Sequence, residues 1–284
     1  MIEMRGKAVA DKIGEEIMAR LPALYEKNIV PTVAIIRVGE DPGDIAYENG
    51  AIKKAKSLGM QAEKYTCKED ILEEDLIAVI EAVNNNDKIH GILLLQPLPK
   101  HMDANKVKNA IKLEKDLDCT SDLALGNLFT GRTNSFAPCT AESVIEILKY
   151  YGVEMASKKA TVLGRSLVIG KPAALLLTEN DATVTICHSK TSKEDLEAAV
   201  KSADIVVAAV GRAGTLTGDL CSGKQYLVDV GINFTEEGKM VGDIDYESCK
   251  DKVLGITPVP GGVGSVTTTI LMRHLLESAE NTSL

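Results

Sequence analysis

The 284-residue sequence has no tryptophan and only 4% aromatic residues, and its excess of acidic over basic side chains gives a net charge of −9. Nucleic-acid binding generally needs basic side chains for the phosphates and aromatic rings on which unpaired bases stack. Their scarcity argues against a nucleic-acid partner. Local binding of a small anion stays open, because a few backbone N–H groups at a helix start suffice for it.

Two further absences narrow the class of protein. No run of about 18 apolar residues occurs, and residues 1–6 lack the basic and apolar regions of a signal peptide. We therefore expect no membrane association and a cytoplasmic location. The six cysteines have no C-x-x-C spacing, which predicts reduced packing residues and neither a metal site nor a disulfide framework.

The sequence alternates strand and helix patterns along most of its length, which is typical of an α/β protein with parallel sheets and right-handed crossovers. The first half predicts the following elements: helix 4–27, strand 31–38, helix 44–58, strand 62–66, helix 72–83 and strand 91–96. The second half predicts another set: helix 140–151, strand 160–163, helix 168–178, strand 182–186, helix 193–201, and strands 204–208 and 226–230. We expect two domains, the second of them doubly wound.

The domain boundary is expected near residues 130–137, where Gly, Arg, Thr, Asn and Ser interrupt the periodicity. A last helix at 266–276 follows a long glycine loop and is too little for a domain of its own. We expect it to return to the first half. The predicted domains are therefore residues 1–137 completed by 265–284, and residues 138–264.

The segment Ala160–Pro172 predicts a strand, a tight turn at Gly164 and Ser166, and a helix. Such a turn directs free backbone N–H groups and the positive end of the helix dipole at one point, where a phosphate can bind. Arg165 adds a positive charge beside it. The spacing from Gly164 to Gly170 is not the Gly-x-Gly-x-x-Gly fingerprint, so an ordinary strand-to-helix turn is the alternative.

Six sequence blocks together resemble one family in their order and spacing. They are Val38-Gly-Glu-Asp-Pro42 with Tyr47, Gly91-Ile-Leu with Pro97-Leu-Pro99, Lys115-Asp-Leu-Asp118, Pro138-Cys-Thr140, Gly164-Arg-Ser166 with Gly170-Lys-Pro172, and Thr257-Pro-Val-Pro-Gly-Gly-Val-Gly264. The chain resembles the methylenetetrahydrofolate dehydrogenase/methenyltetrahydrofolate cyclohydrolase family from about residue 30 to its end. The resemblance implies a Rossmann-like NADP-binding domain, an α/β folate-binding domain and a cleft between them.

The resemblance also implies an activity and its substrate-binding residues. The family transfers a hydride from 5,10-methylenetetrahydrofolate to a nicotinamide, and water then opens the methenyl product to 10-formyltetrahydrofolate. Tyr47 matches the family's cleft tyrosine, and Asp118 matches its pterin-binding aspartate. Gly261 and Gly262 would let the backbone approach the substrate. For each residue taken alone, core packing of Tyr47 or solvation of Asp118 is the plainer interpretation.

The expected cofactor is NADP rather than NAD. No carboxylate that could accept from the ribose hydroxyls follows the strand at 182–186 before Glu194. Arg165 and Ser189 resemble the family residues that hold the 2′-phosphate. The complete predicted cofactor site is Gly164, Arg165, Ser166, Gly170, His188, Ser189, Gly211, Ile232 and Gly264.

Two departures put the second activity in doubt. The bifunctional pattern has a lysine one helical turn after the tyrosine, where this sequence has Ala51, and a supporting glutamine where it has Leu95. Gln96 is no substitute, because successive strand residues face opposite sides. Lys54 returns to the face of Tyr47 two turns on, about 10 Å along the axis. It is our candidate catalytic substitute.

Other interpretations stay open. They are a fully bifunctional enzyme that uses Lys54, a non-catalytic folate- or nucleotide-binding module, and another Rossmann dehydrogenase that shares only the glycine turn. Smaller departures, Cys119, Ala141, Ser143 and Ser265, lie in loops that shape the expected cleft. The family resemblance also implies a homodimer formed through the cofactor domain.

Overall fold

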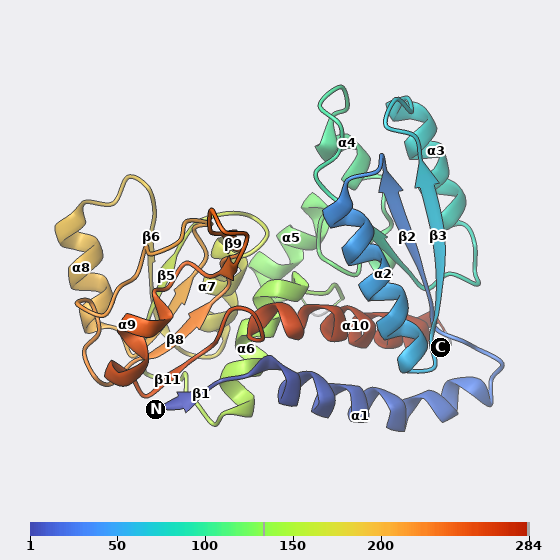
Figure 1. The fold of residues 1–284 in the computed structure, drawn as a ribbon. Helices are drawn as coiled ribbons and strands as arrows, with labels where there is room; N and C mark the ends of the chain where they lie inside the picture. Colours follow the sequence, from blue (N-terminus) through green and yellow to red (C-terminus); the bar gives the residue numbers. More distant parts are fainter. Residues whose placement is uncertain (133, 283–284) are drawn as a thin grey trace. The chain divides into compact units, whose positions relative to one another are not determined.

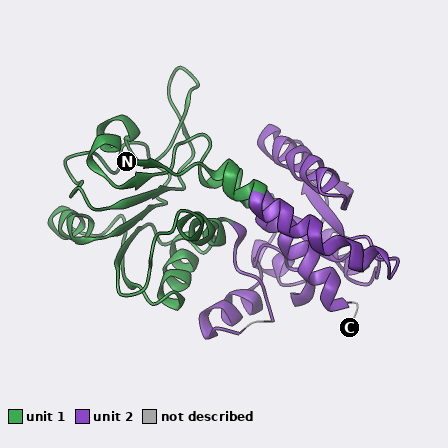
Figure 2. Cartoon of the chain, turned by 90° about the horizontal axis from the view of Figure 1, so that it is seen from below, with its two compact units in different colours: residues 1–11, 140–267 green, residues 12–139, 268–284 purple. Residues whose placement is uncertain are grey.

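The computed structural model describes residues 1–132 and 134–282 and divides into two compact units. Unit 1 comprises residues 1–11 and 140–267, and unit 2 comprises residues 12–139 with the segment that begins at residue 268 (Figure 2). Each unit is an α/β structure with its own parallel sheet (Figure 1). The expected two-domain α/β class is thereby confirmed.

Unit 1 contains a six-stranded sheet in which all neighbouring strands are parallel. In spatial order the strands are β1 (Ile2–Glu3), β11 (Gly255–Ile256), β8 (Tyr226–Asp229), β7 (Ile205–Ala208), β5 (Lys159–Leu163) and β6 (Thr183–Cys187). Strand β7 is apolar and buried along its whole length, and β8 is buried from Leu227 to Asp229, as expected when both faces of a sheet are covered. Its remaining elements are α6 (Cys139–Tyr150), α7 (Gly170–Glu179), α8 (Lys193–Ser202), the short strands β9 (Asn233–Phe234) and β10 (Met240–Val241), α9 (Tyr246–Cys249), and the 3₁₀ turns η2 (Lys250–Lys252) and η3 (Val263–Ser265).

The strand order of unit 1 reverses beside β5. From β5 the chain moves outward to β6 and then returns to β7 on the opposite side of β5. Ligands of doubly wound sheets bind at such a reversal, outside the carboxyl ends of the strands. The turn that begins at Gly164 directly follows β5 and therefore lies at this point.

Unit 2 is built on a three-stranded parallel sheet in the order β3 (Gln61–Cys67), β2 (Thr32–Val38) and β4 (Gly91–Leu94). Every residue of the central strand β2 is buried. Its other elements are α1 (Gly6–Tyr25), most of which belongs to this unit, α2 (Pro42–Ser57), α3 (Glu73–Asn84), α4 (Ala104–Lys108), η1 (Leu113–Lys115), α5 (Asp122–Thr130) and α10 (Thr267–Thr282). Helices α1 and α10 run side by side, and Arg20 pairs with Glu277 and Glu280 between them (Figure 1).

The structure differs from the predicted division at the N-terminus. Residues 1–11 belong to unit 1, because β1 pairs with β11 and the Gly6 N–H donates to the Gly261 carbonyl over 2.8 Å. A two-residue strand has no periodicity that sequence reasoning could detect. The last helix begins at Thr267 and continues to Thr282, and from residue 268 it belongs to unit 2.

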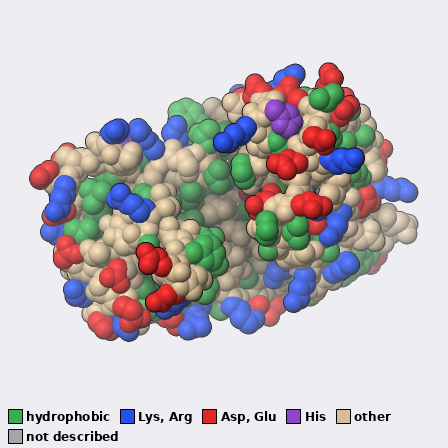
Figure 3. Space-filling view, turned by 45° about the horizontal axis from the view of Figure 1, so that its top comes forward, with side chains coloured by type: hydrophobic (Ala, Val, Ile, Leu, Met, Phe, Trp, Pro, Cys, Tyr) green, Lys and Arg blue, Asp and Glu red, His purple; other side chains and the backbone are tan. Residues whose placement is uncertain are grey.

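The surface carries charges of both signs. On the face drawn in Figure 3, acidic and basic side chains are interspersed, without one continuous basic area. Within residues 1–132 and 134–282, no helix is at once long and apolar enough to cross a membrane. The same residues contain no group of three or more His, Cys, Asp or Glu side chains arranged to hold a metal ion.

Candidate active site

The start of α2 places Tyr47 directly after the loop that follows β2. The Asp41 carboxylate caps this helix, because it accepts hydrogen bonds from the backbone N–H groups of Gly43 and Asp44 at 2.8 and 3.2 Å. Pro42 at the first helical turn fits the same role, since a helix start needs no N–H there. Tyr47 follows in the second turn and remains 38% exposed, so it is available to a ligand.

A buried cluster of charged side chains, formed by Glu48, Arg37 and Lys64, holds the helical turn that contains Tyr47. Glu48, only 1% exposed, accepts from Arg37 Nε at 3.1 Å and from Lys64 Nζ at 2.6 Å. Burial alone would raise the pKa of Glu48, but the hydrogen bonds from Lys64 and Arg37 hold it below its ordinary value. The cluster ties α2 to β2 and β3, and sequence reasoning missed it because the three residues lie on separate elements.

Glu48→Gln is expected to destabilise the protein by about 3 kcal/mol, because it leaves the Arg37 guanidinium buried without a compensating charge. Urea unfolding at neutral pH measures this loss. Lys64→Met is the matched control, since Lys64 is half exposed and should contribute less than about 1 kcal/mol.

The effect of Glu48 should also depend on pH. Its pKa is lower in the folded than in the unfolded chain, so the stabilisation is present above the ordinary value of 4.5 and is lost as the pH falls through the folded value. The difference between wild type and Glu48→Gln should therefore shrink in acid. An equal difference at pH 7 and pH 3 would contradict this assignment.

Asp118 lies close enough to Tyr47 for its carboxylate to act on the tyrosine hydroxyl. Its Oδ1 accepts a hydrogen bond from the backbone N–H of Cys139 at 2.8 Å. Burial raises the pKa of Asp118. Burial, the Asp118 carboxylate and the Cys139 thiol all raise the pKa of the Tyr47 hydroxyl, which stays protonated and able to donate. The structure thus brings the two predicted folate-binding residues together within unit 2.

The loop that carries Asp118 is held from both sides. The Asp116 carboxylate accepts from the backbone N–H groups of Thr120 and Ser121. Lys115 Nζ donates to three backbone carbonyls at the C-terminal end of α3 and just beyond it, those of Val83, Asn84 and Asn86. Cys119 adopts a left-handed φ of 52°, a conformation that favours glycine. The turn is therefore kept although cysteine occupies a position whose conformation suits glycine.

The two departures lie in buried positions. Ala51 is completely buried in α2, and Leu95 is 6% exposed after β4, where its N–H donates to the Ile36 carbonyl. Gln96 is exposed and follows the end of β4 at Leu94, so the strand expected at 91–96 is shorter and its alternation does not reach Gln96. Lys54 is half-buried two turns after Tyr47. Its role as a catalytic substitute stays a prediction.

In unit 1 the predicted phosphate turn has a closely packed backbone. Gly164 has a φ of 118°, and a side chain there would meet the carbonyl of Ala209 at 2.2 Å. The Ser166 hydroxyl accepts from the N–H groups of Ile169 and Gly170 at 3.2 and 3.4 Å, so α7 begins at Gly170 rather than at residue 168. Arg165 is exposed beside this turn. The arrangement fits a cofactor phosphate.

The other predicted cofactor residues follow neighbouring strands at the same sheet edge. His188 and Ser189 come after β6, Gly211 after β7, and Ile232 after β8. His188 Nδ1 accepts from the Lys190 N–H, which shapes the loop, while Ser189 and Ile232 are exposed.

Asp243 organises two of these loops and was missed by sequence reasoning. Its buried carboxylate accepts from the backbone N–H groups of Val210, Gly211 and Arg212 at 2.6 to 2.9 Å, and from the Asn233 side chain at 2.9 Å. A single aspartate after a two-residue strand gives no sequence signal. A carboxylate with four donors holds the loops in one geometry.

The glycine loop after β11 completes unit 1. Gly261 has a φ of 105°, and a side chain at Gly262 would meet the Pro258 carbonyl at 2.5 Å. Gly264 is exposed, and Gly261 is exposed as well. The loop therefore presents bare backbone, as a close approach to a ligand requires.

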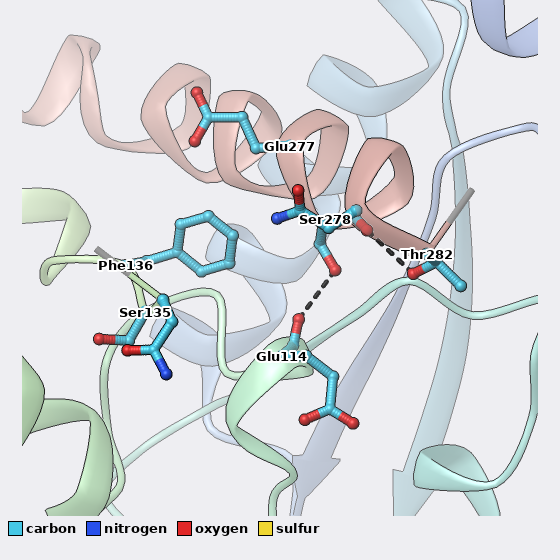
Figure 4. Close-up of a pocket in the computed structure, with 8 residues that line it drawn as sticks. Glu114, Ser135, Phe136, Glu277, Ser278 and Thr282 are labelled. Carbon is cyan, nitrogen blue, oxygen red and sulfur yellow. Dashed lines mark hydrogen bonds between the residues drawn. The ribbon is translucent and has the colours of Figure 1, made fainter. Parts of the chain in front are cut away.

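A separate polar cavity of about 350 Å³ in unit 2 contains none of the predicted site residues. Figure 4 shows Phe136 and Ser135 on one side of it and α10 on the other, with the Ser278 hydroxyl donating to the Glu114 carbonyl at 2.8 Å. This hydrogen bond joins α10 to η1, shortly before Asp118. The cavity is therefore bordered by the segment that leads to Asp118, but it contains neither Tyr47 nor Asp118.

Comparison with known proteins agrees with this arrangement. Residues 4–118 match the family model described as the catalytic domain of tetrahydrofolate dehydrogenase/cyclohydrolase, and residues 138–283 match the model of its NAD(P)-binding domain. The chain is 47% identical over 278 residues to the bifunctional protein FolD of Clostridium botulinum (strain Kyoto / Type A2), covering 98% of each chain.

Two solved structures are similar over almost the whole chain. The bifunctional FolD enzyme of Campylobacter jejuni has a TM-score of 0.96 at 36% identity, with 99% of each chain covered. The Trypanosoma brucei methylenetetrahydrofolate dehydrogenase-cyclohydrolase, solved with NADP and an inhibitor, has a TM-score of 0.94 at 32% identity and covers 100% of this chain and 98% of that one. The resemblance seen in the six blocks is confirmed, and the chain belongs to the tetrahydrofolate dehydrogenase/cyclohydrolase family.

Proposed function

We propose that this protein oxidises 5,10-methylenetetrahydrofolate to 5,10-methenyltetrahydrofolate with NADP. The observation that carries the proposal is the placement of Tyr47 beside the half-buried Asp118 carboxylate in a chain of this family. A carboxylate can accept two hydrogen bonds from the amino and N–H groups of a pterin ring. The protonated Tyr47 hydroxyl and its exposed ring supply a donor and a stacking surface.

The residues of unit 1 suit NADP. The exposed turn of residues 165–168 offers backbone to a phosphate, while the Ile169 and Gly170 N–H groups at the start of α7 are bound by Ser166. Arg165 and Ser189 offer a charge and a hydroxyl to the 2′-phosphate. Bound NADP supplies the nicotinamide that accepts the hydride. The chain's own task is to orient the two ligands, which is where most of the rate gain in such a reaction comes from.

We further propose that cyclohydrolase activity is weak or absent. Ala51 has only a methyl group where the family's lysine positions and activates water, and Leu95 offers no hydrogen bond. The second candidate, a fully bifunctional enzyme, is favoured by Lys54, a half-buried amine on the face of Tyr47.

Turnover separates these functions. The purified protein is followed with 5,10-methylenetetrahydrofolate and NADP, and separately with 5,10-methenyltetrahydrofolate, each against an enzyme-free control. Oxidation of the first without accelerated hydrolysis of the second is the expected result. If the protein catalyses neither reaction, it is a binding module. If it also hydrolyses the second substrate rapidly, it is a bifunctional enzyme.

Arg165→Ala is expected to raise the KM for NADP by about 10- to 100-fold while leaving the KM for NAD nearly unchanged, because a charge-assisted hydrogen bond to the 2′-phosphate is lost. Steady-state kinetics with both nucleotides measures this. Lys193→Ala removes an equally exposed cation at the start of α8 and serves as control. An equal change for NAD and NADP would assign Arg165 to a phosphate that both share.

We also propose that the protein forms a homodimer through unit 1. In support, β6 is an edge strand of the sheet, and Thr183, Thr185 and Ile186 on it are exposed. An edge with free backbone groups is suited to pairing with a second copy. Analytical ultracentrifugation decides between monomer and dimer.

A further inference from the structure

His274 lies buried in α10, only 2% exposed, and contacts the backbone next to Asp118. Its Nδ1 is 2.7 Å from the carbonyl oxygen of Leu117. A carbonyl oxygen only accepts hydrogen bonds, so Nδ1 carries the proton and donates. The contact joins the C-terminal helix to the residue that immediately precedes the pterin-binding carboxylate.

Two neighbours fix the imidazole in this orientation. The Phe136 ring stacks on it with centroids 4.5 Å apart and planes inclined by 16°, and Phe136 lies against α10 (Figure 4). The Cys139 thiol is 3.7 Å from Nδ1 and donates to the same Leu117 carbonyl at 3.5 Å. The ring therefore has little freedom to rotate away from Leu117.

The same group of residues holds the peptide unit of Asp118 at both ends. His274 and the Cys139 thiol bind the Leu117 carbonyl, which belongs to the peptide bond leading into Asp118, while the Cys139 N–H binds the Asp118 carboxylate. Fixing the peptide plane and one carboxylate oxygen leaves the side chain a single direction. Bidentate recognition depends on such a direction, because a displacement of about 1 Å removes one of its two hydrogen bonds.

We infer that His274 is a positioning residue for Asp118: through the Leu117 carbonyl it aims the carboxylate at the pterin ring. This inference rests on the proposed folate-binding function. It assigns His274 no contact with substrate or cofactor. Sequence reasoning did not find it, because a lone histidine in an apolar helix resembles an ordinary core residue.

The test uses three substitutions that differ in where they place an N–H group. The amide nitrogen of His274→Asn reaches the place of Nδ1, that of His274→Gln reaches toward Nε2, and His274→Leu has none. The KM for 5,10-methylenetetrahydrofolate should rise about tenfold in the Gln and Leu variants and less than threefold in Asn. The KM for NADP should stay within twofold in all of them. Glu277→Gln, on the same helix, is the control.

Direct binding of tetrahydrofolate, measured by calorimetry, complements the kinetics and needs no turnover. The expected order of affinity is wild type, then Asn, then Gln and Leu. Rescue by Asn and not by Gln supports positioning through Leu117, and it can be read even if the Leu variant does not fold. Equal affinities for all variants, or a parallel rise in the KM values for folate and NADP, would overturn this inference and leave the proposed function standing. A wild-type protein that binds no tetrahydrofolate would overturn the proposed function and this inference with it.

Discussion

The double substitution Ala51→Lys, Leu95→Gln is expected to raise hydrolysis of 5,10-methenyltetrahydrofolate by about 10²- to 10⁴-fold, the range that a positioned acid or base contributes. Residue 51 follows Tyr47 by one helical turn and shares its face. Both side chains to be replaced are buried, so the new amine and amide lie in poorly solvated surroundings. Desolvation lowers the pKa of a lysine, which makes it a better base near neutral pH.

Controls separate chemistry from packing. Ala51→Met adds a chain of similar length without an amine and should leave hydrolysis at the wild-type level. Each single substitution should gain less than the pair, because the glutamine orients the lysine. Hydrolysis is followed by the loss of methenyl absorbance, corrected for the uncatalysed reaction.

A fast wild-type reaction would show that our interpretation of Ala51 is wrong. In that case Lys54→Ala identifies the substitute: it should abolish hydrolysis if Lys54 supplies the amine. If Lys54→Ala changes nothing and wild-type hydrolysis stays at background, the dehydrogenase-only function is supported.

Asp118→Asn is expected to lower kcat/KM for 5,10-methylenetetrahydrofolate by about 10²- to 10³-fold, with the KM for NADP within twofold of wild type. The asparagine amide keeps one acceptor but turns an N–H group toward a pterin donor, so one hydrogen bond is lost and another group is left unpaired. Asp122→Asn, at the exposed start of α5, is the matched control. A loss shared equally by NADP binding would point to misfolding instead.

Wild-type kinetics should carry the signature of the same carboxyl group. Because burial raises the pKa of Asp118, the group takes up its proton at a higher pH than an exposed aspartate does. The protonated form cannot accept two hydrogen bonds, so the KM for the folate should rise as the pH falls through that raised pKa, about tenfold per pH unit below it. A KM that stays flat through the acid range would exclude a binding role for the carboxylate.

The sequence predicted the regular elements because their patterns are local. The buried run of β2 and the alternation of strands and helices are visible in the spacing of apolar side chains. The start of α7 differs from the prediction because Ser166 binds the N–H groups of Ile169 and Gly170. The roles of Tyr47 and Asp118 came from family resemblance, and their closeness is visible only in the structure, since nothing local connects them. Asp243 and His274 could not be predicted, because their importance lies in backbone groups that only the fold brings near.

The discontinuity of the two units has a consequence for synthesis on the ribosome. Unit 2 buries Ile270, Leu271, Leu275 and Leu276 of α10 completely, so its core lacks a major apolar face until α10 has been made. In unit 1, β1 likewise has no strand to pair with until β11 has been made. Neither unit can finish folding before its second segment has been made, and until then its apolar surface is open to aggregation.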